Sequence, residues 1–546
     1  MKLKLLFFFP LLILLIGKST VFAQETVGLL YNDQNNVADG YTLFSPLTNS
    51  DTYLIDNCGQ VVNQWSFNGT PRAVPYLLED GTILRSGSEG IELRDWDNTL
   101  LWSFNLVEEL NLRQHHDIEP MPNGNILAIV REFISVEEQI NLGKNPALVD
   151  DVLRSEKIME FKPIGTNDIQ IIWEWRFADR LIQDFDSSKA NFGNVADHPE
   201  RIDFNYEDYN MSHEDWIHMN GIDYNSDLDQ IIMSCKSLGE IYIIDHSTTT
   251  AEAASHSGGN YNKGGDFIWR WGNPEVYRQG TSADRKLFEQ HDPKWIPKNY
   301  PNEDKISVFN NDVGATQTHS SVNILTPVPT LTGYEMTNDK FSPSEFFFSW
   351  DGEIRGETFY QPTRSGVTAL PNGNLIFCES SKGQLVEINP SGDIVWVYRN
   401  PSGQSSIIDQ FSSEEEITTN VLFRAEKYPS NYSGFNGKDL TPGNIIEDVN
   451  SNSEACNEAL SVSDSDLIEP ISLLYNPIED NTVFFNSQLH PLTLLNLYHI
   501  DGKLIMKNVQ ADSNKFYLPQ IEKGIYFIVI KNHVDNKTQT IKFIKN

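Results

Sequence analysis

Three histidines occupy matching positions ahead of a turn that recurs along this 546-residue chain. His116 lies six residues before Pro122 of a Pro-Asn-Gly turn, and His291 lies six residues before Pro297 of a Pro-Lys-Asn turn. His218, in the segment DWIHMNG, begins another copy with a looser turn. A neutral imidazole can attack an electrophile, exchange a proton or bind a metal ion. If these positions converge in the fold, the three imidazoles form a catalytic or a metal-binding site.

Polar side chains at related positions surround the three histidines in this pattern. Some of them lie at the end of the strand that follows a histidine-bearing strand. Another lies two residues beyond His218, on the same side of its strand. The last directly precedes the serine that stands in the position of the histidine in a further copy. They are Arg131, Lys236, Asn310, Asn311, Asn220 and Arg364. In a chain whose formal net charge is −35, cations and amides gathered at one place indicate that the site binds an anion.

His115 adjoins His116 in the sequence. Strict alternation along a strand turns neighbouring side chains to opposite faces. We therefore expect His115 to face away from His116 and to bond to a neighbouring repeat. Arg131 fits a surface ion pair as well as it fits the anion site.

A strand pattern that recurs six times must position these residues. Each copy contains a short strand with a tryptophan near its end, and Gly, Asn and Asp turns separate the strands. The tryptophan-bearing segments are VVNQW (61–65), TLLWSF (99–104), IIWEW (171–175), FIWRW (267–271), FFFSW (346–350) and IVWVY (394–398). Four antiparallel strands per copy are typical of the blades of a β-propeller, whose radial repetition hides the sheet edges.

The sequence therefore predicts an all-β fold: a six-bladed β-propeller of four-stranded blades over residues 24–435, which forms the catalytic domain. The first strand of each blade would line a central channel and bring the three histidines to one mouth of it. Stacked β-sandwiches, the competing all-β architecture, would not require the same four-strand pattern six times.

The acidity of the chain and its first residues restrict its partners and its location. A net charge of −35 repels phosphate backbones and argues against binding of nucleic acid. Residues 1–23 have a basic start, an apolar run and small residues before the predicted cleavage after Ala23, which indicates a signal peptide and an exported protein. An uncleaved membrane anchor is the alternative. Four cysteines in an exported chain can pair in three ways, but Cys235 and Cys378 fit buried free thiols equally well.

The last part of the chain differs from the repeats in composition and in its pattern of apolar residues. Residues 436–467 are polar and acidic, which predicts a linker, and residues 468–546 predict a small C-terminal β-sandwich with a hairpin around Asp501-Gly502. The segments DGK, KGIYFI and KFIKN resemble the C-terminal sorting domain of type IX secretion cargo. This resemblance implies recognition by the secretion machinery and delivery through the periplasm to the cell surface or the extracellular space. An additional adhesive β-sandwich is the alternative.

Several separated motifs in the repeats resemble bacterial arylsulfotransferases: HHDIEPMPNGNILAI, DWIHMNGIDY, FEQHDPKWIP and SGVTALPNGNLIFCES. That family has a six-bladed propeller and moves sulfuryl groups from aryl sulfate esters to phenols without a nucleotide sulfate donor. The resemblance implies a small-molecule aryl sulfate donor and a phenolic acceptor for this chain. We expect no cofactor and no metal ion.

Motif by motif, the family's sulfated nucleophilic histidine corresponds to His291, its supporting histidines to His116 and His218, and its asparagine to Asn220. The family's arginine after the IIMS-like strand corresponds to Lys236 here. The lysine ammonium is a point charge, whereas a guanidinium can bind two oxygens at once. This departure concerns the strength of sulfate binding more than the type of reaction. The candidate substrate-binding residues are Asn220, Lys236, Arg131 and Arg364.

The resemblance implies a ping-pong transfer through a sulfohistidine intermediate. Two other functions use the same features. The first is a metal-dependent hydrolase or lyase in which the histidines, with Asp117 or Asp292, bind a metal ion. The second is a non-catalytic surface propeller that binds sulfated or phenolic ligands. Cations beside the histidines count against the metal site, because they oppose the charge of a metal ion.

Overall fold

The computed structural model describes residues 25–207, 215–313, 318–447, 472–486, 489, 493–500, 503–510, 513–531 and 538–546. The predicted signal peptide and most of the predicted linker lie outside these residues. The chain divides into two compact units, Met1–Leu460 and Ser461–Asn546. Among the described residues, no helix combines the length and the apolar character that crossing a bilayer requires.

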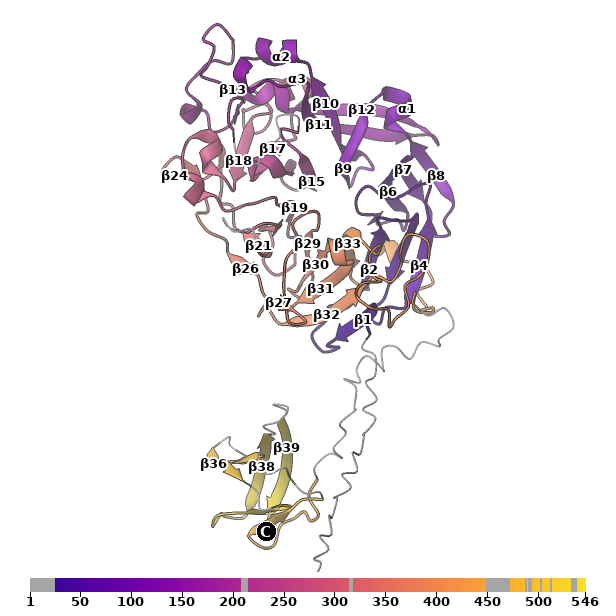
Figure 1. Ribbon diagram of the computed structural model, residues 1–546, viewed down its shortest axis with the longest axis vertical. Helices are drawn as coiled ribbons and strands as arrows, with labels where there is room; N and C mark the ends of the chain where they lie inside the picture. Colours follow the sequence, from indigo (N-terminus) through magenta and orange to yellow (C-terminus); the bar gives the residue numbers. More distant parts are fainter. Residues whose placement is uncertain are drawn as a thin grey trace, which may run out of the picture. The chain divides into compact units, whose positions relative to one another are not determined.

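The described part of the first unit is all-β, as predicted. Six antiparallel sheets follow one another along the chain and are arranged around a common centre (Figure 1). Short helices and small strand pairs fill the connections between the main strands. The helices are α1 (Leu106–Leu110), α2 (Val136–Asn141) and α3 (Thr250–Ala253). The small strands are β13 (Leu181–Ile182), β14 (Ile202–Asp203), β22 (Pro329–Thr330), β23 (Gly333–Tyr334), β24 (Met336–Thr337), β25 (Lys340–Phe341), β27 (Glu353–Ile354) and β28 (Glu357–Thr358).

The first three sheets have four strands each, which follow one another from the centre outward. The first contains β33 (Leu422–Tyr428), β2 (Tyr41–Pro46), β3 (Asp51–Ile55) and β4 (Val61–Ser66). The second contains β5 (Tyr76–Leu77), β6 (Ile83–Gly87), β7 (Gly90–Arg94) and β8 (Leu100–Phe104). The third contains β9 (Arg113–Pro120), β10 (Ile126–Ile134), β11 (Leu153–Ile164) and β12 (Asp168–Arg176).

The remaining three sheets follow the same order. The fourth contains β15 (Met219–Asn225), β16 (Gln230–Cys235), β17 (Glu240–Asp245) and β18 (Phe267–Trp271). The fifth contains β19 (His291–Trp295), β20 (Ile306–Asn310), β21 (Ser321–Leu325) and β26 (Phe348–Trp350). The sixth contains β29 (Val367–Ala369), β30 (Leu375–Glu379), β31 (Gln384–Ile388), β32 (Ile394–Arg399) and β1 (Gly28–Asn32).

The middle strands are apolar on both faces because each sheet packs between two others. In β16, Ile231 and Met233 belong to one hydrophobic cluster, while Ile232, between them, belongs to the next. Side-chain alternation thus places successive residues in the cores on the two sides of the sheet. This packing fixes the direction of each inner strand and therefore of the histidines at the strand starts.

The tryptophan that marks each repeat bonds one sheet to the next. In every case an indole Nε1 donates to a backbone carbonyl in the following sheet or its connection, and the sixth sheet bonds to the first at the loop after β3. The donors are Trp65, Trp102, Trp175, Trp269, Trp350 and Trp396, and the acceptors are Asp95, Asp168, Gly265, Ser342, Gly392 and Asn57 in the same order. The six tryptophan-bearing segments of the sequence contribute to β4, β8, β12, β18, β26 and β32, which confirms them as strands.

The first sheet takes its innermost strand from the far end of the unit. Strand β33 pairs with β2, and β1 pairs with β32 at the outer edge of the sixth sheet. The first repeat of the sequence shows only three strands for this reason. The pattern predicts neither terminal strand.

The second unit is a small β structure with its own hydrophobic core. Its described strands form a four-stranded sheet and a two-stranded pair: β36 (Leu504–Gln510), β35 (Leu494–His499), β38 (Gly524–Lys531) and β39 (Thr538–Lys545), and β34 (Thr482–Phe484) with β37 (Lys515–Tyr517). Strands β35 and β36 pair antiparallel, as the predicted hairpin requires, although Asp501 and Gly502 themselves lie outside the described residues.

The cysteines separate into two kinds. Cys235 and Cys378 are buried free thiols, one of the two arrangements that the sequence leaves open. Cys58 is disulfide-bonded, and Cys456 lies outside the described residues. Burial raises the pKa of the Cys235 thiol, so this thiol stays protonated and serves as a small apolar side chain.

Candidate active site

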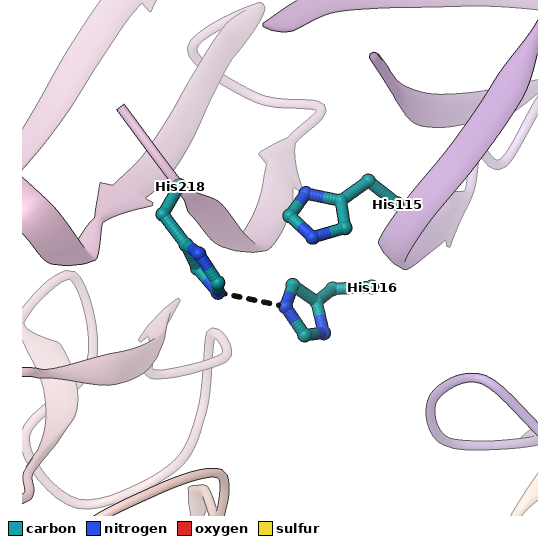
Figure 2. Close-up of side chains that lie close together, drawn as sticks. All are labelled: His115, His116 and His218. Carbon is teal, nitrogen blue, oxygen red and sulfur yellow. Dashed lines mark hydrogen bonds between the residues drawn. The ribbon is translucent and has the colours of Figure 1, made fainter. Parts of the chain in front are cut away.

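Histidines from the third and fourth sheets meet at one end of the innermost strands (Figure 2). His115 and His116 belong to β9, and His218 directly precedes β15. The Nε2 atoms of His116 and His218 are 3.0 Å apart, and the ring centroids of His115 and His116 are 4.1 Å apart. Two imidazole nitrogens at this distance form a hydrogen bond only when one of them carries the proton. His116 and His218 therefore form a pair through which a proton can pass.

The expectation that His115 faces away from His116 is wrong. Gln114 pairs with Val130 and Ile118 pairs with Ala128, so three residues of β9 oppose a single residue of β10. At this bulge His116 has φ 50°, in the left-handed region, and the simple alternation of side chains fails. Both neighbouring imidazoles consequently face the same cavity.

One nitrogen of the His115 ring accepts a hydrogen bond, and the other lies near a buried carboxyl group without forming a hydrogen bond among the described residues. Nη2 of Arg131 lies 2.7 Å from Nε2 of His115, and Oε1 of Glu156 lies 3.1 Å from its Nδ1. Since Arg131 can only donate, Nε2 accepts and Nδ1 carries the proton. Burial, together with the charge of Arg131, lowers the pKa of His115 to about 2, and burial raises the pKa of Glu156 to about 8. His115 is therefore neutral at physiological pH.

His218 is oriented by an aspartate that the sequence pattern does not single out. Oδ2 of Asp215 lies 2.6 Å from Nδ1 of His218. Although burial acts to raise it, the hydrogen bond and charge of His218 hold the pKa of Asp215 at about 2. The carboxylate thus accepts the Nδ1 proton and directs Nε2 of His218 toward His116. A carboxylate in this position also stabilises a positively charged imidazole.

His291, the first residue of β19, has its tautomer set by two acceptors. Its Nδ1 lies 2.9 Å from the backbone oxygen of Glu289 and 2.8 Å from Oδ1 of Asn311. The orientation of the Asn311 amide is fixed because its Nδ2 donates to the carbonyls of Gln361 and Arg364. Nδ1 of His291 therefore carries the proton, and Nε2 keeps its lone pair.

The environment of His291 keeps the ring neutral. Its exposed fraction is 3%. Burial, with the charges of His218 and Lys236, lowers its pKa to about 3 against the opposing effect of the Asn311 hydrogen bond. The ring of Phe423 lies 6.3 Å from that of His291 and 5.7 Å from that of His116. This phenylalanine, from β33, packs against both imidazoles.

A cavity of about 430 Å³ opens onto the histidine cluster. Its lining includes His115, His116 and His218, the apolar side chains of Leu47, Pro71 and Phe423, and the four arginines Arg72, Arg113, Arg131 and Arg364. Apolar walls suit an aromatic ring, and the guanidinium groups suit an anion. The site thus has the chemistry that an aryl sulfate requires.

A family model described as arylsulfotransferase (ASST) matches residues 31–385. The chain belongs to the arylsulfotransferase family. Membership indicates aryl sulfotransferase activity on small-molecule aryl sulfates and phenols. The matched range contains His116, His218 and His291 but ends before β33, which supplies Phe423.

Other comparisons show more distant likenesses. No curated protein matches this arylsulfotransferase in sequence. A protein of unknown function from Bacteroides caccae is 13% identical over 66% of this chain and 93% of its own, with a TM-score of 0.36. A virginiamycin B lyase from Staphylococcus aureus is 12% identical over 69% of this chain and 90% of its own, with a TM-score of 0.31.

The predicted substrate-binding residues of this arylsulfotransferase divide into two groups. Arg131 and Arg364 line the cavity, and Nε of Arg364 donates to Oγ of Ser380 at 3.0 Å. Lys236 forms an ion pair of 2.8 Å with Glu289, two residues before His291. Asn220 is buried, and its Nδ2 donates to the backbone oxygen of Gln290 at 2.8 Å, so it positions the strand that carries His291.

The aspartates that follow the histidines are structural. Arg424 of β33 places Nη2 2.8 Å from Oδ2 of Asp117 and Nη1 2.9 Å from Oδ1 of Asp292. The backbone N–H of Ile222 donates to Asp117, and that of Val367 donates to Asp292. Each aspartate therefore joins neighbouring inner strands and shares one buried arginine. Neither is available as the metal ligand that the hydrolase or lyase alternative requires.

The three imidazoles at the cavity could hold a metal ion by distance alone, since one nitrogen from each of His115, His116 and His218 lies within 4.8 Å of the others. The lone pair of His115 Nε2, however, already accepts from Arg131. Four arginines line the same cavity and raise the cost of bringing a cation to it. The donor set fits an anion better than a metal ion.

Proposed function

We propose that this arylsulfotransferase is a six-bladed β-propeller, closed by β33, that moves a sulfuryl group from an aryl sulfate to a phenol through a sulfohistidine at His291. The observation that carries the proposal is the tautomer of His291, because a nucleophilic imidazole needs a free lone pair on the attacking nitrogen. Two acceptors hold the proton on Nδ1, and burial keeps the ring neutral.

In the first step, Nε2 of His291 attacks sulfur, the N–S bond forms and the bond from sulfur to the aryl oxygen breaks. The electron pair of that bond leaves with the phenolate. The phenolate takes a proton from the pair of His116 and His218, which starts the cycle with one proton more than the neutral pair and is then left neutral. The sulfonated imidazole ring carries a positive charge, and the acceptors at Nδ1, Asn311 Oδ1 and the carbonyl of Glu289, stabilise it. Lys236 is placed to attract the sulfuryl oxygens beside His291.

In the second step, a phenol oxygen attacks sulfur and the N–S bond breaks, which returns the electron pair to Nε2 of His291. The phenol proton passes to the same histidine pair. Asp215 supports His218 as this pair changes its charge, because a carboxylate at Nδ1 stabilises the imidazolium form. The same groups thus act as acid in the first step and as base in the second.

The covalent route is tested with the donor alone. Mixing the protein with 4-nitrophenyl sulfate should release a burst of one 4-nitrophenolate per active site, and mass spectrometry should find one SO₃ group on the peptide that contains His291. Addition of phenol should remove this group and form phenyl sulfate, which is the control for a competent intermediate. Transfer to phenol without a burst or a sulfated His291 peptide would refute the two-step mechanism.

The Asp215→Asn substitution should lower kcat/KM by about 10²–10⁴-fold with phenyl sulfate as donor, the range that a general acid contributes. The loss should be far smaller with 4-nitrophenyl sulfate, because 4-nitrophenolate is a weak base and leaves without a proton. Steady-state rates with the two donors measure the difference. An equal loss with both donors would mean that Asp215 only maintains the fold, and Asp215→Glu should recover part of the phenyl sulfate activity.

We further propose that residues 1–23 direct export and that the second unit is a sorting domain that brings the enzyme to the cell surface or the extracellular space. The support comes from the composition of the first residues and from the DGK, KGIYFI and KFIKN segments. An enzyme outside the cytoplasm has no supply of nucleotide sulfate donors, so a donor that is itself an aryl sulfate suits this location.

A further inference from the structure

Arginines from two parts of the chain gather on one side of the cavity. Arg113 and Arg131 are direct cross-strand partners in the β9–β10 pairing, and both line the cavity together with Arg72. Like charges directly opposite each other destabilise a sheet. An anion between these side chains would remove that repulsion, so the arrangement indicates a place for an anionic group.

The three guanidinium groups have unused donors. None of the residues that line the cavity is acidic, and in the described ranges none of these three arginines forms an ion pair. Among the described residues, Arg131 has one side-chain acceptor, Nε2 of His115, and its buried Nε has no hydrogen-bond partner. Arg131 also lies opposite Glu156 in the β10–β11 pairing, but burial raises the pKa of that carboxyl group to about 8, so it is largely neutral at pH 7. Among the described residues, Arg72 and Arg113 thus keep their guanidinium donors for an anionic ligand.

These arginines are separate from the cation beside the nucleophile. Lys236 pairs with Glu289, whose carbonyl accepts from His291, whereas Arg131 contacts His115. Neither Lys236 nor His291 is among the residues that line the cavity of the arginines. Phe423 contributes an apolar wall to the same cavity. With the reacting sulfuryl group assigned to the place beside Lys236 and His291, the arginines are left for a second anionic group on the same aromatic compound.

We propose that Arg72, Arg113 and Arg131 form a second anion subsite, and that the natural donor and acceptor are aryl compounds with a carboxylate, sulfate or phosphate group besides the reacting oxygen. This substrate class rests on the sulfotransferase function proposed above. Because the donor and the acceptor of a ping-pong enzyme use one site in turn, the preference should apply to both.

The test compares two acceptors with equal phenol rings, 4-hydroxyphenylacetate and 4-hydroxyphenylacetamide, with 4-nitrophenyl sulfate as donor. The wild type should prefer the charged acceptor in kcat/KM by about tenfold or more, the worth of one charge-assisted contact. The double substitution Arg72→Gln/Arg113→Gln should bring the ratio of the two kcat/KM values, measured within that variant, close to one. Equal kcat/KM for both acceptors in the wild type, or an unchanged preference in the double variant, would overturn the proposal.

The control variant is Arg355→Gln, which removes the same charge at an exposed position that does not line the cavity and should keep the preference. Turnover of the amide reports on the sulfotransferase function independently of the subsite. If no acceptor is turned over, calorimetric titration with 1,3-benzenedisulfonate and benzenesulfonate tests the anion subsite by binding alone. The disulfonate should bind more tightly to the wild type by about tenfold and lose this advantage in the double variant; equal binding of the two compounds would refute the subsite.

Discussion

His291→Gln should abolish sulfuryl transfer, with a loss of about 10⁴-fold or more in kcat, because the substitution removes the nitrogen to which the proposed mechanism transfers the sulfuryl group. Glutamine retains an amide that can bond to Asn311 and is close to imidazole in size, so the substitution leaves the packing of β19 in place. The burst of 4-nitrophenolate and the sulfated peptide should both disappear. Turnover within tenfold of the wild type would show that His291 is not the nucleophile.

Two further measurements separate this loss from a general defect. His319→Gln, which changes a histidine paired with Asp351 at 3.8 Å, should leave turnover within about twofold. Because the pKa of His291 is about 3, the ring stays neutral at neutral pH, with its proton on Nδ1, and protonation of Nε2 removes the nucleophile only as the pH falls toward that value. The burst amplitude of the wild type should therefore stay constant from about pH 8 to about pH 5. A burst that follows a titration near pH 6.5 would contradict the environment described for His291.

Arg424→Met should lower the free energy of unfolding by about 3–5 kcal/mol, the effect of removing one partner from a buried ion pair. The arginine has an exposed fraction of 1% and contacts both Asp117 and Asp292. Without it, Asp117 loses the cation it is paired with among the described residues, and Asp292 keeps only Lys294, whose Nζ lies 3.7 Å from its Oδ1. Urea unfolding followed by tryptophan fluorescence measures the change.

A charge-removing second substitution tests the cause of this loss. Adding Asp292→Asn to Arg424→Met should recover part of the stability, because one buried carboxylate is then neutral. Arg355→Met, at an exposed position, should change the free energy of unfolding by less than about 0.5 kcal/mol. If Asp292→Asn lowered the free energy of unfolding of Arg424→Met by as much as it lowers that of the wild type, the arginine would act through packing and not through charge.

The sequence predicts the frame of the site because the frame repeats. The tryptophan strands are recognisable from the sequence because each indole makes the same contact. Its N–H donates to a backbone carbonyl of the next sheet, as in Trp65 and Trp396. The same repetition places His116 and His218 side by side through their register alone. Periodicity is thus sufficient for elements that every sheet shares.

The rest of the site could not be predicted, because it depends on local departures from the repeating pattern. The bulge at His116 breaks the alternation that would turn His115 away from the cavity. Phe423 and Arg424 belong to a strand without a counterpart in the first repeat, and Arg72 is an exposed residue in a connection. No spacing rule marks such positions. Asp215 carries one signal, its place three residues before His218, but a carboxylate at that distance is common beside any histidine.

The late position of β33 in the chain has a consequence for the synthesis of the enzyme. Until residues 422–428 have left the ribosome, the first sheet lacks its inner strand, Asp117 and Asp292 lack Arg424, and the histidines lack the wall formed by Phe423. Chains that stop before this strand therefore carry every predicted catalytic histidine and still cannot assemble the pocket. Competence for sulfuryl transfer therefore depends on a strand that is synthesised after all the others of the first six sheets.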